Sequence, residues 1–155
     1  MPKIQETRTV SRPRSEVFSY VADFANIAQW DPGVTASERI DKGALRVGSS
    51  FTLMVRFGSQ QLPMVYSITS LTADSCVELE GVGEKLKAID EIRFSDAAAG
   101  GTRIDYSADL RFKGFLRLLS PFMGRTLRKV GGEALDGLVS QLGESPASKV
   151  DEDLS

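Results

Sequence analysis

Between residues 35 and 112, polar and apolar side chains alternate over most of the chain. A period of two is typical of β-strands that bury one face. The connecting stretches, such as "GSQ", "TADS" and "GVG", are short and rich in turn-forming residues. Because connectors of this length join antiparallel neighbours, the pattern predicts an antiparallel meander. Its strands are expected at 35–42, 49–57, 61–72, 76–81, 85–95 and 101–112.

The segment before the meander predicts one more strand and two short helices. Residues 3–10 alternate in the same way and add a seventh strand. The stretch "SRPRSEVFSYVAD" predicts a helix, because Pro13 suits a first helical turn and Ser11 can serve as the N-terminal cap. A second short helix is expected at about 24–29, where the following Pro-Gly ends it.

The C-terminal part changes to helical spacing. A long helix is predicted at about 121–142, with a short segment before it and one apolar stripe along it. At roughly 1.5 Å per residue this helix spans about 33 Å, which makes it the one predicted element able to cover a seven-stranded sheet. We therefore expect a single α+β domain over residues 1–143, in which a curved sheet wraps around the helix and leaves a cavity. Residues 144–155 are polar and acidic, and we expect a disordered tail there.

Composition excludes several kinds of site. The chain has no histidine and Cys76 is its one cysteine, which excludes Ser-His and Cys-His catalysis, an internal disulfide and the usual zinc sites. A net charge of -2 gives no broad basic field for nucleic acid, and no run of about 18 apolar residues predicts a membrane span. The first ten residues lack the apolar centre of a signal peptide. We expect a cytoplasmic protein without a cofactor or metal.

Three stretches occur in an order that is typical of a known family. The stretch "SRPRSEVFSYVADFANIAQWDPGV" is followed much later by a "GGTR" turn into the last strand and by Ser120-Pro121 before the long helix. In this the chain resembles the SRPBCC superfamily, the START/Bet v 1-like group that includes polyketide cyclases and lipid-transfer domains. The resemblance covers about residues 1–143 and implies a helix-grip fold around a hydrophobic pocket. It implies no particular ligand, because members bind lipids, hormones, quinones, polyketides or proteins.

The phase of each strand and of the helix predicts which residues face the pocket. Trp30, the one tryptophan, either packs as core or borders the pocket mouth as a gate. Gly131, in the long helix, either leaves space under the sheet or permits close packing. The candidate ligand-binding residues are Trp30, Phe51, Leu53, Val55, Met64, Tyr66, Leu79, Asp90, Ile92, Tyr106, Ala108, Leu110, Met123, Leu127, Val130 and Gly131.

Three charged residues share the inward phase of their strands. Glu6 and Arg8 lie in the first strand, and Asp90 lies in the strand at 85–95. Buried charges need partners, so Arg8 is expected to pair with Glu6 or Asp90 if these side chains point inward. The alternative is that the first strand twists and its charges reach solvent. In the inward arrangement, Glu6, Arg8 and Asp90 are further candidate ligand-binding residues.

Three functions follow from this pattern. An apolar pocket with a few polar groups favours binding or carrying an apolar small molecule of lipid, polyketide or aromatic type. A pocket carboxylate such as Asp90 or Glu6, with its pKa raised by burial, could act as a general acid or base in a polyketide cyclase- or dehydrase-like enzyme. The sequence contains no catalytic signature, so catalysis is not the leading expectation. A protein-interaction module, and hence a protein partner, stays open.

Overall fold

A computed structural model describes residues 3–119 and 124–143, and the structural statements below concern those residues. Within them, seven strands form one antiparallel sheet in the order β1-β7-β6-β5-β4-β3-β2. The strands are β1 (Lys3–Val10), β2 (Val34–Arg39), β3 (Ser50–Phe57), β4 (Gln60–Thr72), β5 (Cys76–Val82), β6 (Leu86–Asp96) and β7 (Thr102–Phe112). The helices are α1 (Arg14–Ala22), α2 (Ile27–Trp30), α3 (Phe115–Leu119) and α4 (Gly124–Leu142), with short 3-10 turns η1 (Phe24–Asn26) and η2 (Ala98–Gly100).

The connectors explain the order of the strands. From β2 to β7 each strand pairs with the next one along the chain, as short connectors require. β1 then pairs antiparallel with β7, so that Ile4 lies opposite Ala108. The register shifts between Val34 and Ala36 and between Ile68 and Ser70. Such irregularities increase twist and bend strands, and the sheet curls around its apolar face.

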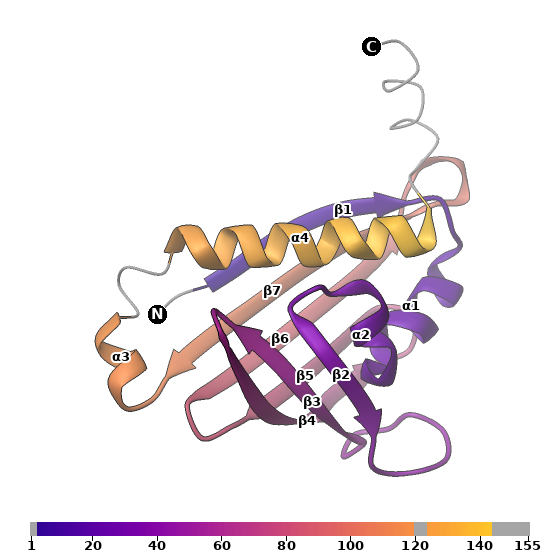
Figure 1. Ribbon diagram of the computed structural model, residues 1–155. Helices are drawn as coiled ribbons and strands as arrows, with labels where there is room; N and C mark the ends of the chain where they lie inside the picture. The colour runs from indigo at the N-terminus through magenta and orange to yellow at the C-terminus, as the bar shows by residue number, and fades with distance from the viewer. Residues whose placement is uncertain (1–2, 120–123, 144–155) are drawn as a thin grey trace.

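Helix α4 covers the concave side of the sheet. Figure 1 shows it lying along β1, with α1 and α2 near its C-terminal end. One face of α4 is buried, including Leu127, Leu135 and Leu138. The helix ends at Leu142, and Gly143 follows with a φ of 91°, a left-handed conformation that glycine adopts at little cost. This helix-grip arrangement confirms the predicted fold class.

Two details differ from the sequence-based predictions, and two predicted segments lie beyond the described residues. β2 ends at Arg39 rather than near residue 42. Ser11 does not cap α1: Pro13 occupies the cap position without a side-chain hydrogen bond, while the Ser11 amide donates to the Gly143 carbonyl. The predicted short segment before the long helix is α3. The predicted helix start at 121–123 and the predicted tail at 144–155 lie outside the described residues.

No helix among residues 3–119 and 124–143 combines the length and the apolar character needed to cross a membrane.

Candidate functional site

A cavity of about 350 Å³ lies between the sheet, the end of α2 and the N-terminal half of α4. Its wall is mainly apolar and comes from six strands and two helices, with Phe57, Leu86 and Phe112 contributing at one end. Several residues that the phase of the strands and of the long helix predicted also lie on this wall: Leu53, Val55, Tyr66, Asp90, Tyr106, Ala108, Leu110, Leu127 and Val130. The size falls within the range of small-molecule pockets.

A second group of candidate residues is buried away from the wall. Phe24 fills the sheet interior near α1 and contacts the rings of Phe51 and Tyr66, with centroids 6.2 and 5.5 Å apart. Strand phase shows which face a residue occupies, but it does not show where along the strand the interior is filled. The residues concerned are Phe51, Met64, Leu79 and Ile92, all at most 2% exposed. Met123 lies outside the described residues.

Trp30 belongs to the core rather than to the cavity wall. It is 3% exposed, and its indole Nε1 is buried without a hydrogen-bond partner in the described structure. Helix α4 passes so close to α2 that a Cβ atom on Gly137 would overlap the Trp30 carbonyl oxygen. The neighbouring residue, Asp31, lines the cavity instead. The structure thus favours the core interpretation of Trp30 over the gate.

Gly131 permits close packing and does not widen the cavity. A Cβ atom on Gly131 would overlap Cγ2 of Ile4, which means that α4 lies directly against β1 at this point. Ile4 itself lines the cavity. Of the two interpretations of this glycine, the structure supports the close approach of helix and strand.

Glu6 and Arg8 do not form a cluster with Asp90. Arg8 Nη1 lies 3.1 Å from Glu6 Oε2, and Arg8 Nε lies 3.0 Å from Asp136 Oδ1 on α4. Both side chains of the Arg8–Glu6 pair are partly exposed. Of the two partners that the sequence offered for Arg8, the structure shows Glu6 and not Asp90, and it adds Asp136, which the sequence did not predict. β1 is an edge strand, so side chains with the inward phase reach the polar side of α4 and solvent there.

Asp90 lies deep in the cavity wall and has one free oxygen. Its Oδ2 accepts a hydrogen bond of 2.8 Å from the Tyr106 hydroxyl, whereas Oδ1 is buried without a partner in the described structure. The residue is 3% exposed. Burial raises the pKa of Asp90 to about 7; the hydrogen bond from Tyr106 opposes this rise and the charge of Asp31 adds to it. Asp90 can therefore hold or release a proton near neutral pH.

Asp31 is a second cavity carboxylate, and sequence reasoning missed it. Its Oδ1 accepts a 2.8 Å hydrogen bond from the Gly33 amide, as in a side-chain turn. Burial raises the pKa of Asp31 to about 6, the Gly33 amide opposes this rise, and the charge of Glu133 adds to it. The available signal was "WDPG", which predicts a helix end but equally places an acid beside the predicted mouth.

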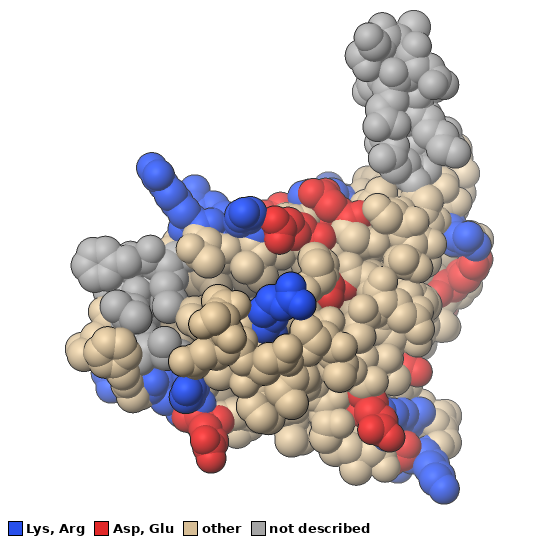
Figure 2. Space-filling model, in the orientation of Figure 1, with Lys and Arg blue, Asp and Glu red and all other residues tan. Residues whose placement is uncertain are grey.

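The phenol groups of Tyr66 and Tyr106 complete the polar part of the wall. Burial and the nearby charge of Asp90 raise the pKa of each tyrosine well above its ordinary value, so both hydroxyls stay protonated. Arg56 lines the cavity on β3 and is itself exposed. Figure 2 shows this face as largely uncharged, with a basic side chain over the region of β2 and β3 and an acidic one close to it. The site thus combines an apolar interior with few charges.

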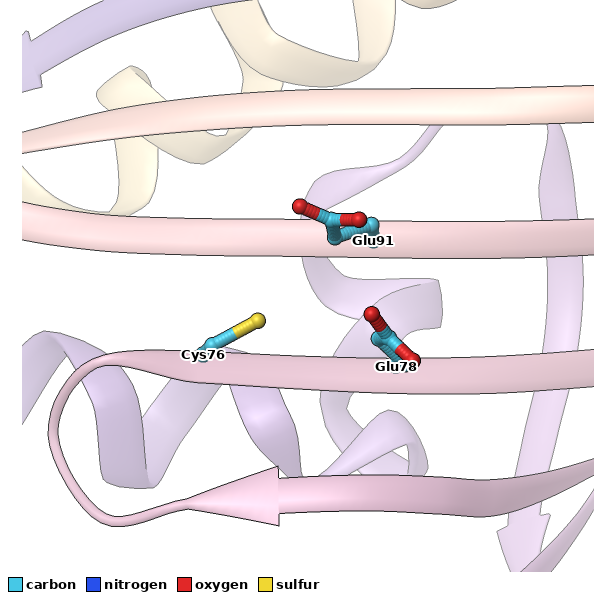
Figure 3. Close-up of side chains that lie close together, drawn as sticks. All are labelled: Cys76, Glu78 and Glu91. Atoms are coloured by element: carbon cyan, nitrogen blue, oxygen red, sulfur yellow. The ribbon is translucent and has the colours of Figure 1, made fainter.

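The outer face of the sheet carries a separate group of possible metal ligands. Cys76 and Glu78 on β5 and Glu91 on β6 have ligand atoms within 4.8 Å of one another (Figure 3). The guanidinium of Arg93 forms an ion pair with Glu91 and thereby occupies that carboxylate. Burial raises the pKa of the Cys76 thiol, which disfavours the thiolate that a metal needs. The arrangement therefore does not identify a metal centre.

Solved structures with the same fold come from several bacteria. A protein from Thermus thermophilus matches with a TM-score of 0.76 and 12% identity, covering 91% of this chain and 97% of that one. A START superfamily protein from Mycobacterium smegmatis matches with a TM-score of 0.68 and 17% identity, covering 89% and 92%. The Zhui aromatase/cyclase from a Streptomyces species matches with a TM-score of 0.63 and 14% identity, covering 90% and 88%. At these identities the likeness shows the fold alone.

Comparisons of the sequence with curated proteins and with family models gave different results. A comparison with curated proteins gave no match. A family described as polyketide cyclase / dehydrase and lipid transport matches over residues 1–143, which is most of the chain. Together with the curled sheet, the covering helix and the internal cavity, this match shows that the chain belongs to the polyketide cyclase / dehydrase and lipid transport family of the SRPBCC superfamily.

Proposed function

We propose that this protein binds or carries an apolar small molecule, of lipid, polyketide or aromatic type, in the cavity under α4. The observation that carries this proposal is the cavity itself, about 350 Å³ of space with a mainly apolar wall. Natural cores are packed to the density of organic crystals. An unfilled space of this size costs stability, and a ligand that covers its apolar surface recovers part of that free energy.

Native mass spectrometry after gentle purification from the natural host tests the proposal. The expected result is a mass above that of the chain, which organic extraction removes. The variant Ala108→Leu, which adds volume on the cavity wall, should lose that extra mass while staying folded. A matched control is Ser107→Leu, because Ser107 precedes Ala108 on β7 and takes the opposite face. Retention of the extra mass by Ala108→Leu would show that it binds elsewhere.

A second candidate function is acid–base catalysis of the cyclase or dehydrase type. One observation favours it: Asp90, with a pKa of about 7, faces an apolar cavity beside the hydroxyl of Tyr106. A carboxyl group poised near neutral pH can take a proton from a bound molecule or deliver one to it. Turnover of a polyketide-like substrate that is lost in Asp90→Asn, with binding retained, would support catalysis over simple carriage.

A further inference from the structure

The cavity wall carries two carboxylates that form no ion pair with the described residues. Asp31 and Asp90 both line it, and the charge of Asp31 is close enough to raise the pKa of Asp90. None of the ion pairs among the described residues includes either carboxylate. A buried negative charge in an apolar setting is costly unless it is paired or neutralised by a proton. The two carboxylates therefore favour a positive partner that the described residues do not supply.

Asp90 also has a carboxylate oxygen that can accept a hydrogen bond from a ligand. Its Oδ2 is held by Tyr106, and its Oδ1 is buried without any partner in the described structure. An unsatisfied buried carboxylate oxygen costs free energy that a hydrogen-bond donor would recover. Since Asp90 lies on the cavity wall, a donor on a bound molecule can supply this hydrogen bond.

The groups around Asp31 and Asp90 favour a positively charged group on the ligand over a negatively charged one. Tyr66 on β4 and Tyr106 on β7 line the cavity, and the negative charge of Glu133 on α4 acts on Asp31. Arg56, on β3, is the one basic residue on the described cavity wall, and its side chain is exposed, where solvent screens its charge. Where Asp31 and Asp90 are ionised, the electrostatic potential inside the cavity is therefore negative.

We propose that the cavity binds a molecule with a protonated amine on an apolar body, and that the ammonium group lies between Asp31 and Asp90. The inference rests on the proposed small-molecule binding and names its ligand class. An ammonium donates to the free Oδ1 and neutralises the carboxylates, whereas a neutral alcohol supplies a hydrogen bond without charge. An anionic group of the same shape is repelled.

The proposal implies that affinity depends on pH in one direction. An ammonium is attracted to ionised carboxylates, and the pKa values of about 6 for Asp31 and about 7 for Asp90 mean that both are mostly protonated at low pH. An alkylamine stays protonated throughout this range. Binding of an amine should therefore strengthen as pH rises from about 5.5 to about 8.

Three probes with one apolar body test this inference: phenylbutylamine, phenylbutanol and phenylbutyrate. Their dissociation constants are measured by isothermal titration calorimetry on the full chain. At about pH 8 the amine should bind roughly tenfold more tightly than the alcohol, and the carboxylate more weakly than both. Lowering the pH to about 5.5 should weaken the amine by about tenfold and change the alcohol little.

Matched variants locate the effect. Asp90→Asn should remove about tenfold of the amine affinity at pH 8 and leave the alcohol unchanged. Glu91→Gln is the control, because Glu91 is the next residue on β6, takes the outer face and also loses one charge. If Asp90→Asn does not fold, the pH dependence of amine binding to the parent protein tests the proposal without the variant.

The outcomes separate this inference from the proposed function. If the alcohol binds as tightly as the amine at pH 8, or if amine affinity does not rise with pH, the ligand class is wrong while small-molecule binding stands. If none of the probes binds and no mass co-purifies from the host, both proposals fail.

Discussion

The hydroxyl of Tyr106 on β7 donates a 2.8 Å hydrogen bond to the Asp90 carboxylate on the neighbouring strand β6, inside the cavity under α4. The two residues are diagonal neighbours, two positions apart in the register, since Asp90 pairs with Ala108 and Ile92 pairs with Tyr106. The contact therefore depends on the β6–β7 register, and it favours the ionised form of Asp90 against the effect of burial.

Replacing Tyr106 with phenylalanine should raise the pKa of Asp90 above about 7. The hydroxyl favours the ionised carboxylate, and its removal leaves the desolvation of Asp90 less opposed. Carbon-13 NMR titration of the Asp90 carboxyl measures the shift directly. Tyr20→Phe is the control, because the Tyr20 hydroxyl hydrogen-bonds to the exposed Gln29 side chain. An unchanged or lower pKa in Tyr106→Phe would contradict the contact.

Asp90→Asn should make the protein more stable than its parent at alkaline pH. The folded protein holds a proton on Asp90 up to about pH 7, whereas the unfolded chain releases it near pH 4, so the parent loses stability as pH rises between these values. The variant does not titrate there. The free energy of unfolding is measured with urea at pH 4 and at pH 8. The difference between variant and parent should grow with pH, by an amount on the order of 3 kcal/mol. If this difference between variant and parent stays constant with pH, folding does not raise the pKa of Asp90.

Gly137→Ala should destabilise the fold by about 1 to 3 kcal/mol, although alanine is the better helix former. The added methyl group would overlap the Trp30 carbonyl, and backbone atoms at a helix contact cannot move aside cheaply. Gly132→Ala is the matched control on the same helix. Its methyl group would meet the Arg8 side chain at an ordinary 3.8 Å, so this variant should gain up to about 1 kcal/mol. Thermal unfolding of both variants shows whether steric overlap or the helix propensity of alanine has the larger effect on stability.

Arg8→Met should cost no more than about 1 kcal/mol and leave the pKa of Asp90 unchanged. Arg8 pairs with Glu6 and Asp136, and the carboxylate of Asp136 is largely exposed. The stability difference from the parent should shrink in high salt, which screens such pairs. A shift in the Asp90 titration on replacing Arg8 would restore the charge cluster that the sequence had predicted.

Much of the fold could be predicted because its signals are local. Alternation along "TRIDYSADLRF" shows which side chains face inward on β7, and the turn-rich connectors dictate which strands pair. The same phase placed Tyr106 and Asp90 on one face without knowledge of their contact. It could not show that Phe24 fills the interior at Phe51 and leaves space at Leu110, because this depends on where the helical segments pack against the sheet.

The sequence by itself determined the antiparallel order of the strands and the covering helix, because period, turn chemistry and connector length act between neighbouring residues. Only the tertiary structure decided that Arg8 pairs with Asp136, that Asp31 joins Asp90 and that Trp30 belongs to the core. Each of these depends on where α4 crosses the sheet, and that crossing depends on close contacts at Gly131 and Gly137 between segments far apart in the chain.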